Sequence, residues 1–215
     1  MHYTSVLFDL DGTLLDTLGD LTAAMNRTLT RHGLPERTRQ QMRTALGNGA
    51  RRLMELSVPA GTDGALFETL LAEYNADYAA HCRIETAPYP GVDALLRQLH
   101  AQGRKLAIVS NKPDEAVRAL RTEFFADTVP IAVGEKTGIR RKPAPDTLLA
   151  AMAQLGADPA STVYVGDSEV DIATARAAGL PCISVLWGFR DRDLLEQAGA
   201  QQFAADAGEL ARLLD

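Results

Sequence analysis

Four aspartates stand just after apolar runs or one helical turn beyond them. Asp9 and Asp11 follow the first apolar run of the chain, and Asp167 follows a later one, with Asp171 four residues further on. Four carboxylates gathered at one point repel one another, so a divalent cation must neutralise them, and a set of oxygen ligands favours Mg²⁺ over Zn²⁺. Mg²⁺ held by a few carboxylates usually also binds a substrate phosphate. The sequence therefore predicts a Mg²⁺ cofactor and a small phosphorylated metabolite as substrate.

Donor groups that suit a phosphate stand elsewhere in the chain. A phosphoryl oxygen accepts hydrogen bonds from hydroxyl, backbone amide and ammonium groups. Ser110 and Lys142 offer the hydroxyl and the ammonium, and the backbone amides of Gly12 and Asn111 are the predicted phosphate-binding amides. Gly12 also permits close approach of the backbone to a ligand. Since nothing in the sequence resembles a catalytic pair of serine and histidine, we expect the nucleophile to be a carboxylate.

Each of these features also has a purely structural interpretation. Asp11-Gly12 is a common turn signal. Asp167 and Asp171 suit the N-terminus of a helix, and Ser110-Asn111 suits a helix cap and turn. Lys142 alone would be read as a solvated loop lysine. These separate interpretations do not explain why the polar groups follow the apolar runs in this order.

Buried strands are the elements that must position these residues. Three short apolar runs are the best strand candidates, and two others are weaker: Val6–Phe8, Leu106–Val109 and Val163–Val165, then Cys182–Leu186 and Val129–Val133. Continuous apolar character over so few residues is typical of strands buried on both faces of a parallel sheet. In an open α/β sheet ligands lie at the carboxyl ends of the strands, so we expect the polar groups to meet at one edge. Strand alternation would also point Asp9 and Asp11 to the same side.

Helical patterns alternate with the strand candidates. Four helices are predicted in this part of the chain: Gly91–Gln102, Asp114–Thr122, Asp146–Leu155 and Asp171–Ala178. Strands and helices that alternate indicate right-handed βαβ units. The predicted fold class is therefore α/β, with a doubly wound, Rossmann-like parallel sheet as its core.

One segment departs from this alternation. Between Leu18 and Arg83 the apolar residues show helical periodicity, and no run there is typical of a strand. The helices predicted in it are Leu18–Thr30, Gln40–Ala45, Ala50–Leu56 and Ala65–Ala80. A block of helices inserted after the first strand should form a small domain of its own. We therefore predict an α/β core of residues 1–16 and 86–215 and an inserted all-helical domain of residues 17–85.

Composition narrows the classes of partner. The 215 residues carry a net charge of −6, which argues against nucleic acid or an anionic membrane as the main partner. No apolar run reaches the roughly 18 residues that a membrane span needs. The two cysteines, Cys82 and Cys182, are too few for a disulfide framework and favour a reducing compartment. We expect a cytoplasmic protein that is a monomer or homodimer.

Four motifs give the chain a resemblance that covers nearly its whole length. They read "FDLDGTLLDT" at 8–17, "IVSNKP" at 108–113, "RKPAPD" at 141–146 and "VGDSEVDI" at 165–172. Their sequences, order and separations resemble the haloacid dehalogenase superfamily of phosphohydrolases. The helical insert is similar to the helical cap of that family. Because dehalogenases of this fold lack an aspartate at the position of Asp11, hydrolysis of a carbon–halogen bond is not expected.

The resemblance implies a role for each core residue. Asp9 attacks phosphorus and forms an aspartyl-phosphate, and Asp11 protonates the leaving alkoxide and later deprotonates the hydrolytic water. Ser110 bonds the phosphate, and Lys142 offsets charge on Asp9 and on the transferring group.

The resemblance also implies how the metal is held. Mg²⁺ binds the Asp9 carboxylate, the Asp11 backbone carbonyl and Asp167, with Asp171 completing the site directly or through water.

The substrate depends on the helical insert, which holds eight arginines and no lysine. A missing lysine argues against phosphonatases, which use a cap lysine. The glycine-flanked loop with Asn48, Gly49 and Arg51 opens a predicted helix and suits a second small anion such as a carboxylate. The alternative is a plain helix connection with solvated arginines.

The stretch "GNGARRLMEL" is also similar to the cap of phosphoglycolate phosphatases, which implies hydrolysis of 2-phosphoglycolate. Other substrates stay open, namely nucleotides, pyrophosphate and sugar phosphates. A phosphotransferase of the β-phosphoglucomutase type is a further alternative, since it uses the same two aspartates.

Overall fold

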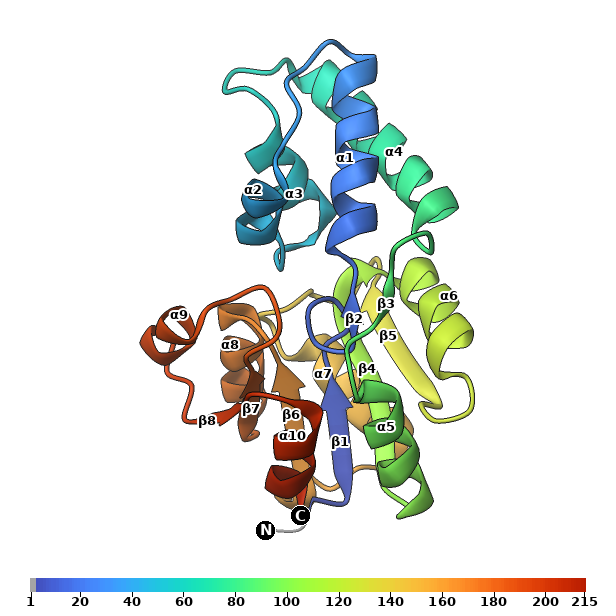
Figure 1. Ribbon diagram of the computed structural model, residues 1–215, viewed down its shortest axis with the longest axis vertical. Helices are drawn as coiled ribbons and strands as arrows, with labels where there is room; N and C mark the ends of the chain where they lie inside the picture. Colours follow the sequence, from blue (N-terminus) through green and yellow to red (C-terminus); the bar gives the residue numbers. More distant parts are fainter. Residues whose placement is uncertain (1–2) are drawn as a thin grey trace. The chain divides into compact units, whose positions relative to one another are not determined.

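A computed structural model describes residues 3–215 (Figure 1). The chain divides into two compact units, one made of the residues up to Asp16 together with Pro88–Asp215, the other of Thr17–Ala87. We call them the α/β unit and the helical unit. This division lies two residues beyond the predicted end of the insert at residue 85, and the first two residues of the predicted core lie outside the described residues.

The α/β unit is built on one parallel sheet of six strands. The strands, in chain order, are β1 (Ser5–Phe8), β4 (Lys105–Pro113), β5 (Ile131–Glu135), β6 (Thr162–Gly166), β7 (Cys182–Val185) and β8 (Gln202–Ala204). They lie side by side in the order β5-β4-β1-β6-β7-β8, and every pair in the sheet is parallel. Counted along the chain this is the order 3-2-1-4-5-6, in which the direction of winding reverses at β1. The predicted doubly wound α/β fold is confirmed.

The two central strands are buried along their whole length because apolar side chains occupy both faces. In β1, Val6, Leu7 and Phe8 have no exposed surface, and Leu7 is in register with Tyr164 of β6. Removing a side chain such as Leu7 from water contributes about 1.5 to 3 kcal/mol. These strands are therefore rigid supports for the residues that follow them.

Helices cover both faces of the sheet. Their bounds are α5 (Val92–Ala101), α6 (Asp114–Phe125), α7 (Asp146–Leu155), α8 (Glu169–Ala178), α9 (Arg192–Gln197) and α10 (Ala207–Leu214), with a 3₁₀ turn at Pro159–Ser161. In Figure 1, α5 and α10 lie in front of the sheet and α7 lies behind it. The four predicted helices of this unit are present, whereas β8, α9 and α10 were not predicted.

Helix α8 begins two residues before its predicted start because of its cap. The Ser168 side chain and the Asp171 side chain form a capping box, which places the first helical residue at Glu169. Strand β4 continues to Pro113, through the residues that were expected to follow it. Its register against β5 is irregular between Val109 and Pro113.

The helical unit consists of four helices. They are α1 (Leu18–Arg31), α2 (Arg39–Ala45), α3 (Gly49–Ser57) and α4 (Gly64–His81). Helices α1 and α4 pack together, and Arg27 and Arg31 of α1 both pair with Asp77 of α4 at 2.6 Å. The Asp20 side chain of α1 accepts hydrogen bonds from three successive backbone amides, Ile84 to Thr86. The last segment of the unit is thereby fixed to its first helix.

Short strands lie at the two points where the chain passes between the units. They are β2 (Leu15–Asp16) and β3 (Ala87–Pro88), and they form a two-stranded sheet. Among the helices of the described residues, none combines the length and the apolar character that crossing a bilayer requires.

Candidate active site

Three of the four predicted aspartates meet at the carboxyl ends of β1 and β6. Asp9 is the first residue after β1, Asp167 is the first after β6, and Asp171 lies in the first turn of α8. Each offers a carboxylate oxygen, and these oxygens lie within 4.8 Å of one another. All three residues are buried, Asp171 completely. Parallel strands that end at the same edge bring these distant residues together.

Lys142 places its ammonium group inside this cluster. The Nζ atom lies 2.8 Å from Asp9 Oδ1 and 2.7 Å from Asp171 Oδ1, and it donates a hydrogen bond to the Tyr164 hydroxyl at 3.0 Å. An ammonium group has three donors, and here each has an acceptor. The lysine is 2% exposed, so it is a fixed internal cation and not a solvated loop lysine.

The loop that carries Lys142 is itself held from β4. The Asn111 side chain accepts a hydrogen bond from the Lys142 amide at 2.8 Å and donates one to the Lys142 carbonyl at 3.0 Å. The sequence pointed to the Asn111 backbone amide as a phosphate donor. The structure adds a different role for its side chain, which fixes the backbone of Lys142 through two hydrogen bonds.

Asp171 has both carboxylate oxygens occupied by protein donors. Oδ2 accepts from the amide and the hydroxyl of Ser168, and Oδ1 accepts from Lys142 and from the Tyr164 hydroxyl at 3.1 Å. A carboxylate with this many donors is fixed in orientation. Asp171 therefore anchors Lys142, and a metal ion would have to share its oxygens.

Asp167 is held by two groups from different segments. Its Oδ1 accepts a hydrogen bond from the Thr13 hydroxyl at 3.2 Å, and its Oδ2 accepts one from the Phe189 amide at 2.7 Å. The segment after β7 thus contributes to the site, although no residue of it was predicted there. Gly188 is required beside it, because a Cβ atom at this position would lie 2.4 Å from the Cβ of Asp167.

The electrostatics of the cluster fit a cation. Burial, with further contributions from Asp171 and Asp167, raises the pKa of Asp9 well above its ordinary value, although Lys142 opposes the shift. Burial and the charge of Asp171 raise the pKa of Asp167 to about 7. Burial alone would lower the pKa of Lys142, but Asp171 and Asp9 outweigh it and raise that pKa. One ammonium does not balance three buried carboxylates, so the all-oxygen donor set is suited to a hard divalent ion.

Asp11 lies apart from the three clustered carboxylates. Strand β1 ends at Phe8, and Asp11 instead forms an isolated bridge with Leu15. Strand alternation therefore does not apply to Asp9 and Asp11, because the chain has left the strand before Asp9. The Asp11 side chain is 19% exposed, and its Oδ2 accepts a hydrogen bond from the Ser110 hydroxyl at 3.4 Å. Ser110 and Asp11 are thus neighbours.

Gly12 is required for its backbone conformation. Its φ angle is +85°, and a Cβ atom there would lie 2.3 Å from Asp167 Oδ2. Its amide donates a hydrogen bond to the Leu15 carbonyl at 2.9 Å. This differs from the expectation that the Gly12 amide donates to a phosphate, because the N–H closes the turn after β1.

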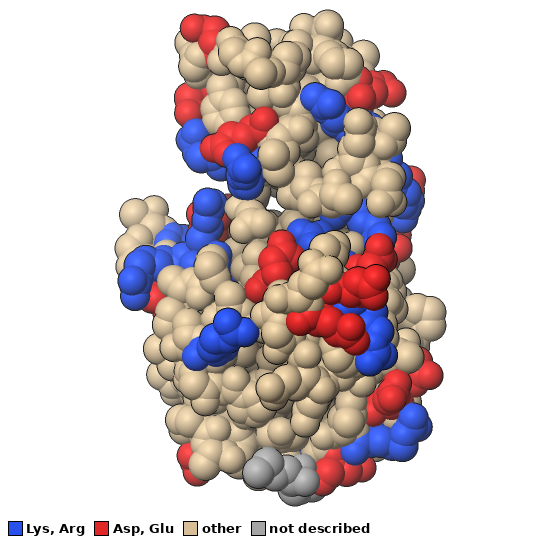
Figure 2. Space-filling view, turned by 90° about the vertical axis from the view of Figure 1, so that its left-hand side faces the viewer, with Lys and Arg blue, Asp and Glu red and all other residues tan. Residues whose placement is uncertain are grey.

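The predicted specificity residues belong to the helical unit. Asn48 is the N-cap of α3 and makes no side-chain cap hydrogen bond, and Gly49 is the first residue of the helix, with φ +78°. Arg51 pairs with both oxygens of Glu68 at 2.8 Å and lies over the Phe67 ring. An anion would therefore compete with Glu68 for Arg51. Figure 2 shows acidic and basic side chains interspersed on the face of the molecule that it draws.

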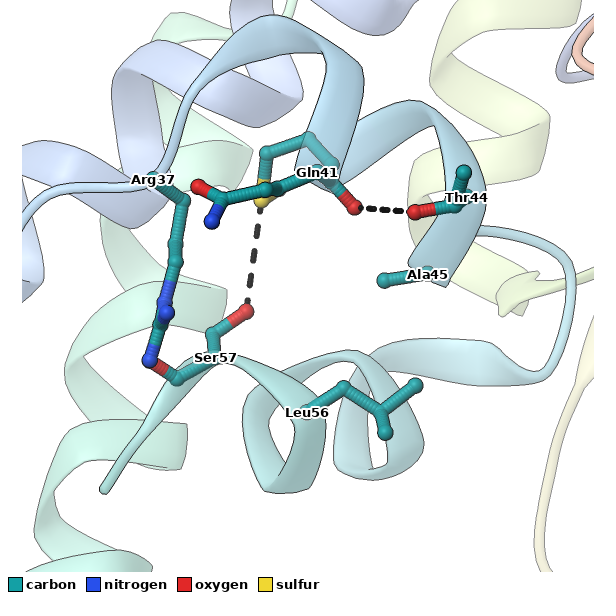
Figure 3. A pocket seen from close by; sticks show the side chains of 7 residues that line it. Arg37, Gln41, Thr44, Ala45, Leu56 and Ser57 are labelled. Carbon is teal, nitrogen blue, oxygen red and sulfur yellow. Dashed lines mark hydrogen bonds between the residues drawn. The ribbon is translucent and has the colours of Figure 1, made fainter.

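A cavity of about 340 Å³ lies within the helical unit between α2 and α3 (Figure 3). It is lined by Arg37, Gln41, Met42, Thr44, Ala45, Leu56 and Ser57. The Arg37 side chain donates to the Ser57 carbonyl at 2.7 Å. Asn48, Gly49 and Arg51 do not line this cavity, so it is separate from the predicted anion site.

Comparison with known proteins decides the family. The sequence profile described as "Haloacid dehalogenase-like hydrolase" matches residues 6–185. The chain belongs to this family. The match spans all three segments that supply the clustered carboxylates and Lys142.

Individual relatives of this haloacid dehalogenase-like hydrolase are phosphatases. A phosphoglycolate phosphatase of Xanthomonas campestris pv. campestris is 37% identical over 187 residues, which cover 86% of this chain and 84% of the relative. An N-acetylmuramic acid 6-phosphate phosphatase of Pseudomonas aeruginosa is 32% identical, over 100% of this chain and 96% of the relative. The crystal structure of a candidate phosphoglycolate phosphatase from Lactobacillus delbrueckii subsp. bulgaricus gives a TM-score of 0.94 at 36% identity, covering 100% and 99% of the two chains. Family and relatives together indicate a phosphoric monoester hydrolase.

Proposed function

We propose that the protein is a Mg²⁺-dependent phosphatase that hydrolyses 2-phosphoglycolate to glycolate and phosphate through an aspartyl-phosphate on Asp9. The observation that carries the proposal is the state of the Asp9 carboxylate. Its Oδ1 accepts hydrogen bonds from Lys142 and from the Leu10 amide at 2.7 Å, whereas Oδ2 accepts none from the described residues. One oxygen is therefore anchored while the other is left for attack on phosphorus.

The metal ion has a definite set of residues to hold it. The Asp9 and Asp167 carboxylates and the Asp11 backbone carbonyl are the proposed ligands, with Asp171 reached through water because its oxygens already accept four hydrogen bonds. Bound Mg²⁺ supplies positive charge that keeps the carboxylates ionised and neutralises phosphoryl oxygens. Asp9 needs this help, since burial raises its pKa and favours the protonated form, which is a poor nucleophile.

In the first step an Asp9 oxygen forms a bond to phosphorus and the bond from phosphorus to the leaving oxygen breaks. Asp11, in its protonated form, gives its proton to that oxygen, so the alcohol leaves neutral. Lys142 stays protonated and hydrogen-bonded to Asp9 throughout. Ser110 donates a hydrogen bond to a phosphoryl oxygen in place of Asp11.

In the second step water attacks the aspartyl-phosphate. Asp11 is now a carboxylate and removes a proton from the attacking water, the bond between the Asp9 oxygen and phosphorus breaks, and inorganic phosphate leaves. Both aspartates return to their starting states. Asp9 therefore accepts and then releases the phosphoryl group, and Asp11 gives and then takes back a proton. Their surroundings differ accordingly, since Asp9 is buried beside Lys142 and Asp11 is partly exposed.

The substrate assignment draws on the helical unit and on the relatives. Phosphoglycolate carries a carboxylate besides its phosphate, and we propose that Arg51, with Asn48 and Gly49, binds that carboxylate. The Xanthomonas relative is a phosphoglycolate phosphatase, and the Lactobacillus structure is that of a candidate phosphoglycolate phosphatase. A second candidate is a carboxylated sugar phosphate, favoured by the relative that acts on N-acetylmuramic acid 6-phosphate and spans the whole chain. Both candidates combine a phosphomonoester with a carboxylate.

A screen of phosphate release in the presence of Mg²⁺ tests the proposal. The panel contains 2-phosphoglycolate, N-acetylmuramic acid 6-phosphate, nucleoside monophosphates, pyrophosphate and hexose phosphates. We expect the highest kcat/KM with 2-phosphoglycolate. Preference for an uncarboxylated substrate would contradict the substrate assignment. Isomerisation of a sugar phosphate without release of phosphate would instead indicate a phosphotransferase.

Arg51→Met is expected to raise KM for 2-phosphoglycolate by about 10- to 100-fold, because a hydrogen bond to a charged group contributes about 1.5 to 3 kcal/mol. The KM for p-nitrophenyl phosphate, which has no carboxylate, should stay within about 2-fold. Arg52→Met is the matched control, since Arg52 is the next residue of α3 and pairs with Glu55. An equal change of KM for both substrates would show that Arg51 has no role in carboxylate binding.

Mg²⁺ is expected to stabilise the protein more at pH 8 than at pH 5. The pKa of Asp167 is about 7 in the metal-free folded protein and 3.8 ordinarily, so the folded state binds this proton more tightly. The metal-free protein therefore loses stability as the pH rises from about 4 to about 7, and Mg²⁺, which binds the ionised carboxylates, restores it.

Thermal unfolding with EDTA or Mg²⁺ at the two pH values measures this effect. At a free Mg²⁺ concentration 100 times Kd, mass action adds about 2.7 kcal/mol. For a chain of this length that is a rise in Tm of about 5 to 10 °C. Asp167→Asn should depend less than the wild type on both Mg²⁺ and this pH window. The same Mg²⁺ shift at pH 5 and pH 8 would contradict the expectation.

Partners and location remain predictions. We retain a small phosphorylated metabolite as substrate, no nucleic acid or membrane partner, a monomer or homodimer, and a cytoplasmic location. The net charge of −6 argues against a nucleic acid or an anionic membrane as the main partner.

A further inference from the structure

A second buried lysine lies beside Asp11. Lys112 belongs to the irregular part of β4 and its side chain is only 5% exposed. Its Nζ atom lies 3.0 Å from Asp11 Oδ1. Each of the two aspartates of "FDLDGT" therefore has its own lysine, Lys142 for Asp9 and Lys112 for Asp11.

The segment of β4 that carries Lys112 contacts both oxygens of Asp11. The Ser110 hydroxyl donates to Oδ2 at 3.4 Å, and the same hydroxyl accepts a hydrogen bond from the Lys112 amide at 3.2 Å. Residues two apart in a strand lie on the same face, and Ser110 and Lys112 both reach this carboxylate from β4, within the stretch where its register against β5 is irregular.

We propose that Lys112 is a positioning residue for Asp11, which holds Oδ1 so that Oδ2 faces the leaving-group oxygen. This rests on the proposed role of Asp11 as general acid and base. The Lys112 ammonium transfers no proton. It keeps one oxygen of the carboxyl group engaged, and its positive charge stabilises the carboxylate that remains when Asp11 has given its proton to the leaving oxygen.

Burial gives a first reason to assign Lys112 a role beyond packing. A buried ammonium group costs free energy unless it is paired with a carboxylate, and here the paired carboxylate is the proposed general acid and base. A partly exposed carboxylate that must both donate and accept a proton within one cycle also needs a fixed orientation. Lys112 supplies that orientation from a strand of the central sheet.

The dependence of rate on the leaving group tests the proposal. For Lys112→Met, kcat/KM is measured with Mg²⁺ on phosphomonoesters whose leaving groups range from an alkyl alcohol to p-nitrophenol. The value of kcat/KM reports the first step. In that step an alkyl alcohol needs the proton of Asp11 to leave, whereas p-nitrophenol leaves readily as an anion. We expect a loss of about 100-fold for the alkyl ester, in the usual range for general acid catalysis. The loss for p-nitrophenyl phosphate should be less than about 3-fold.

Three variants serve as references. Lys112→Arg keeps the charge and should recover a large part of the alkyl-ester activity. Lys105→Met is the matched control on the same strand, where an exposed lysine bonds the Gly156 carbonyl, and its leaving-group dependence should equal the wild type. Asp11→Asn should show the same leaving-group pattern as Lys112→Met and a larger loss. Equal Tm values for the Lys112 variants and the wild type, within a few degrees, exclude misfolding.

Two results would overturn the positioning role. An equal loss of kcat/KM for all leaving groups would show that Lys112 binds the phosphoryl group. A rise in KM confined to carboxylated substrates would show that it binds the substrate's second anion. If Asp11→Asn loses the same kcat/KM for all leaving groups, the role of Asp11 in the proposed function fails. If Asp11→Asn loses more for the alkyl ester but Lys112→Met does not, only the role of Lys112 is rejected.

Discussion

Asp9→Asn is expected to reduce kcat by roughly 10⁴-fold or more, since loss of a nucleophile removes the covalent route. An amide nitrogen or oxygen at this position is a far weaker nucleophile toward phosphorus than a carboxylate. The substitution keeps the shape of the side chain, so the hydrogen bond from Lys142 to Oδ1 and that from the Leu10 amide have an acceptor still. The loss of rate should therefore occur without loss of fold.

The thermal stability of Asp9→Asn is a second readout, and it should not fall although the activity does. Burial and the neighbouring carboxylates raise the pKa of Asp9, which means that its charge destabilises the metal-free folded protein at neutral pH. Asparagine removes that charge. We therefore expect the Tm of Asp9→Asn in EDTA at pH 7.5 to equal or exceed that of the wild type, and the Tm gain from Mg²⁺ to shrink because one ligand is weakened.

Trapping of the intermediate separates the nucleophile from other roles. Wild-type protein quenched in acid after mixing with ³²P-labelled substrate should carry label that hydroxylamine removes, as expected of an acyl phosphate, and Asp9→Asn should carry none. Asp93→Asn, at a half-exposed aspartate of α5 paired with Arg97, is the matched control and should behave as wild type. Turnover of Asp9→Asn near the wild-type rate would show that another residue attacks phosphorus.

The residues that sequence reasoning placed correctly stand at the ends of regular, buried strands. Asp9 and Asp167 each follow a strand of four or five buried residues, and these strands are recognisable because each contains an uninterrupted apolar run, Val6–Phe8 in one and Val163–Val165 in the other. The rule that ligands lie at the carboxyl ends then brings Asp9, Asp167 and Asp171 together without knowledge of the coordinates. Lys142 was a candidate phosphate donor from its residue type, but its role beside Asp9 came from the family resemblance, because a loop position has no periodic signal.

What was missed lies where the chain departs from regular geometry. Lys112 is inside the irregular part of β4, and although it ends a predicted strand, nothing in the sequence indicates that its side chain pairs with Asp11. Phe189 and Gly188 follow β7, a strand that was identified, but the carboxyl-end rule was applied only to the three stronger strands. Applying it to β7 would have placed the segment after Val185 at the site.

Elements at the edge of the sheet were also missed, for a different reason. Strand β8 consists of Gln202, Phe203 and Ala204, and only Phe203 is a large apolar residue. An edge strand has one neighbour and a solvent side, so its sequence need not be continuously apolar. Its pairing with β7 depends on tertiary context, which a three-residue pattern does not carry.

Residues outside the reacting groups hold Asp171 and Lys142 in position. Tyr164 and Ser168 hold Asp171, which in turn holds Lys142. Tyr164 also has a pKa raised by burial and by Asp171, so it remains a neutral hydroxyl that donates and accepts hydrogen bonds. Lys142 thus compensates the charge of both Asp9 and Asp171.

Lys142→Met is therefore expected to lower both activity and stability. The kcat should fall by about 10²- to 10³-fold, the usual effect of removing one preorganised donor from the reacting group. Removal of one partner from a buried ion pair typically costs about 3 to 5 kcal/mol, because the remaining charge is left without compensation. For a chain of this length the corresponding fall in Tm is about 6 to 20 °C.

The pH dependence of the loss of stability identifies its cause. At pH 5 the Asp167 carboxyl, whose pKa is about 7, is protonated in the metal-free protein, so the cluster carries less negative charge and has less need of a cation. At pH 8 Asp167 is ionised, and loss of the Lys142 ammonium leaves its charge without compensation. Thermal unfolding in EDTA should therefore show a larger difference between wild type and Lys142→Met at pH 8 than at pH 5.

Lys142→Arg separates charge from geometry. It keeps a cation in the cluster, but a planar guanidinium does not reproduce the three bonds to Asp9, Asp171 and Tyr164 that one ammonium makes. We expect it to recover the pH 8 stability in part and the activity hardly at all. If Lys142→Met lost the same stability at both pH values, the loss would come from packing, and the electrostatic account of this lysine would be rejected. If it kept its activity, Asp9 would not need the ammonium to react.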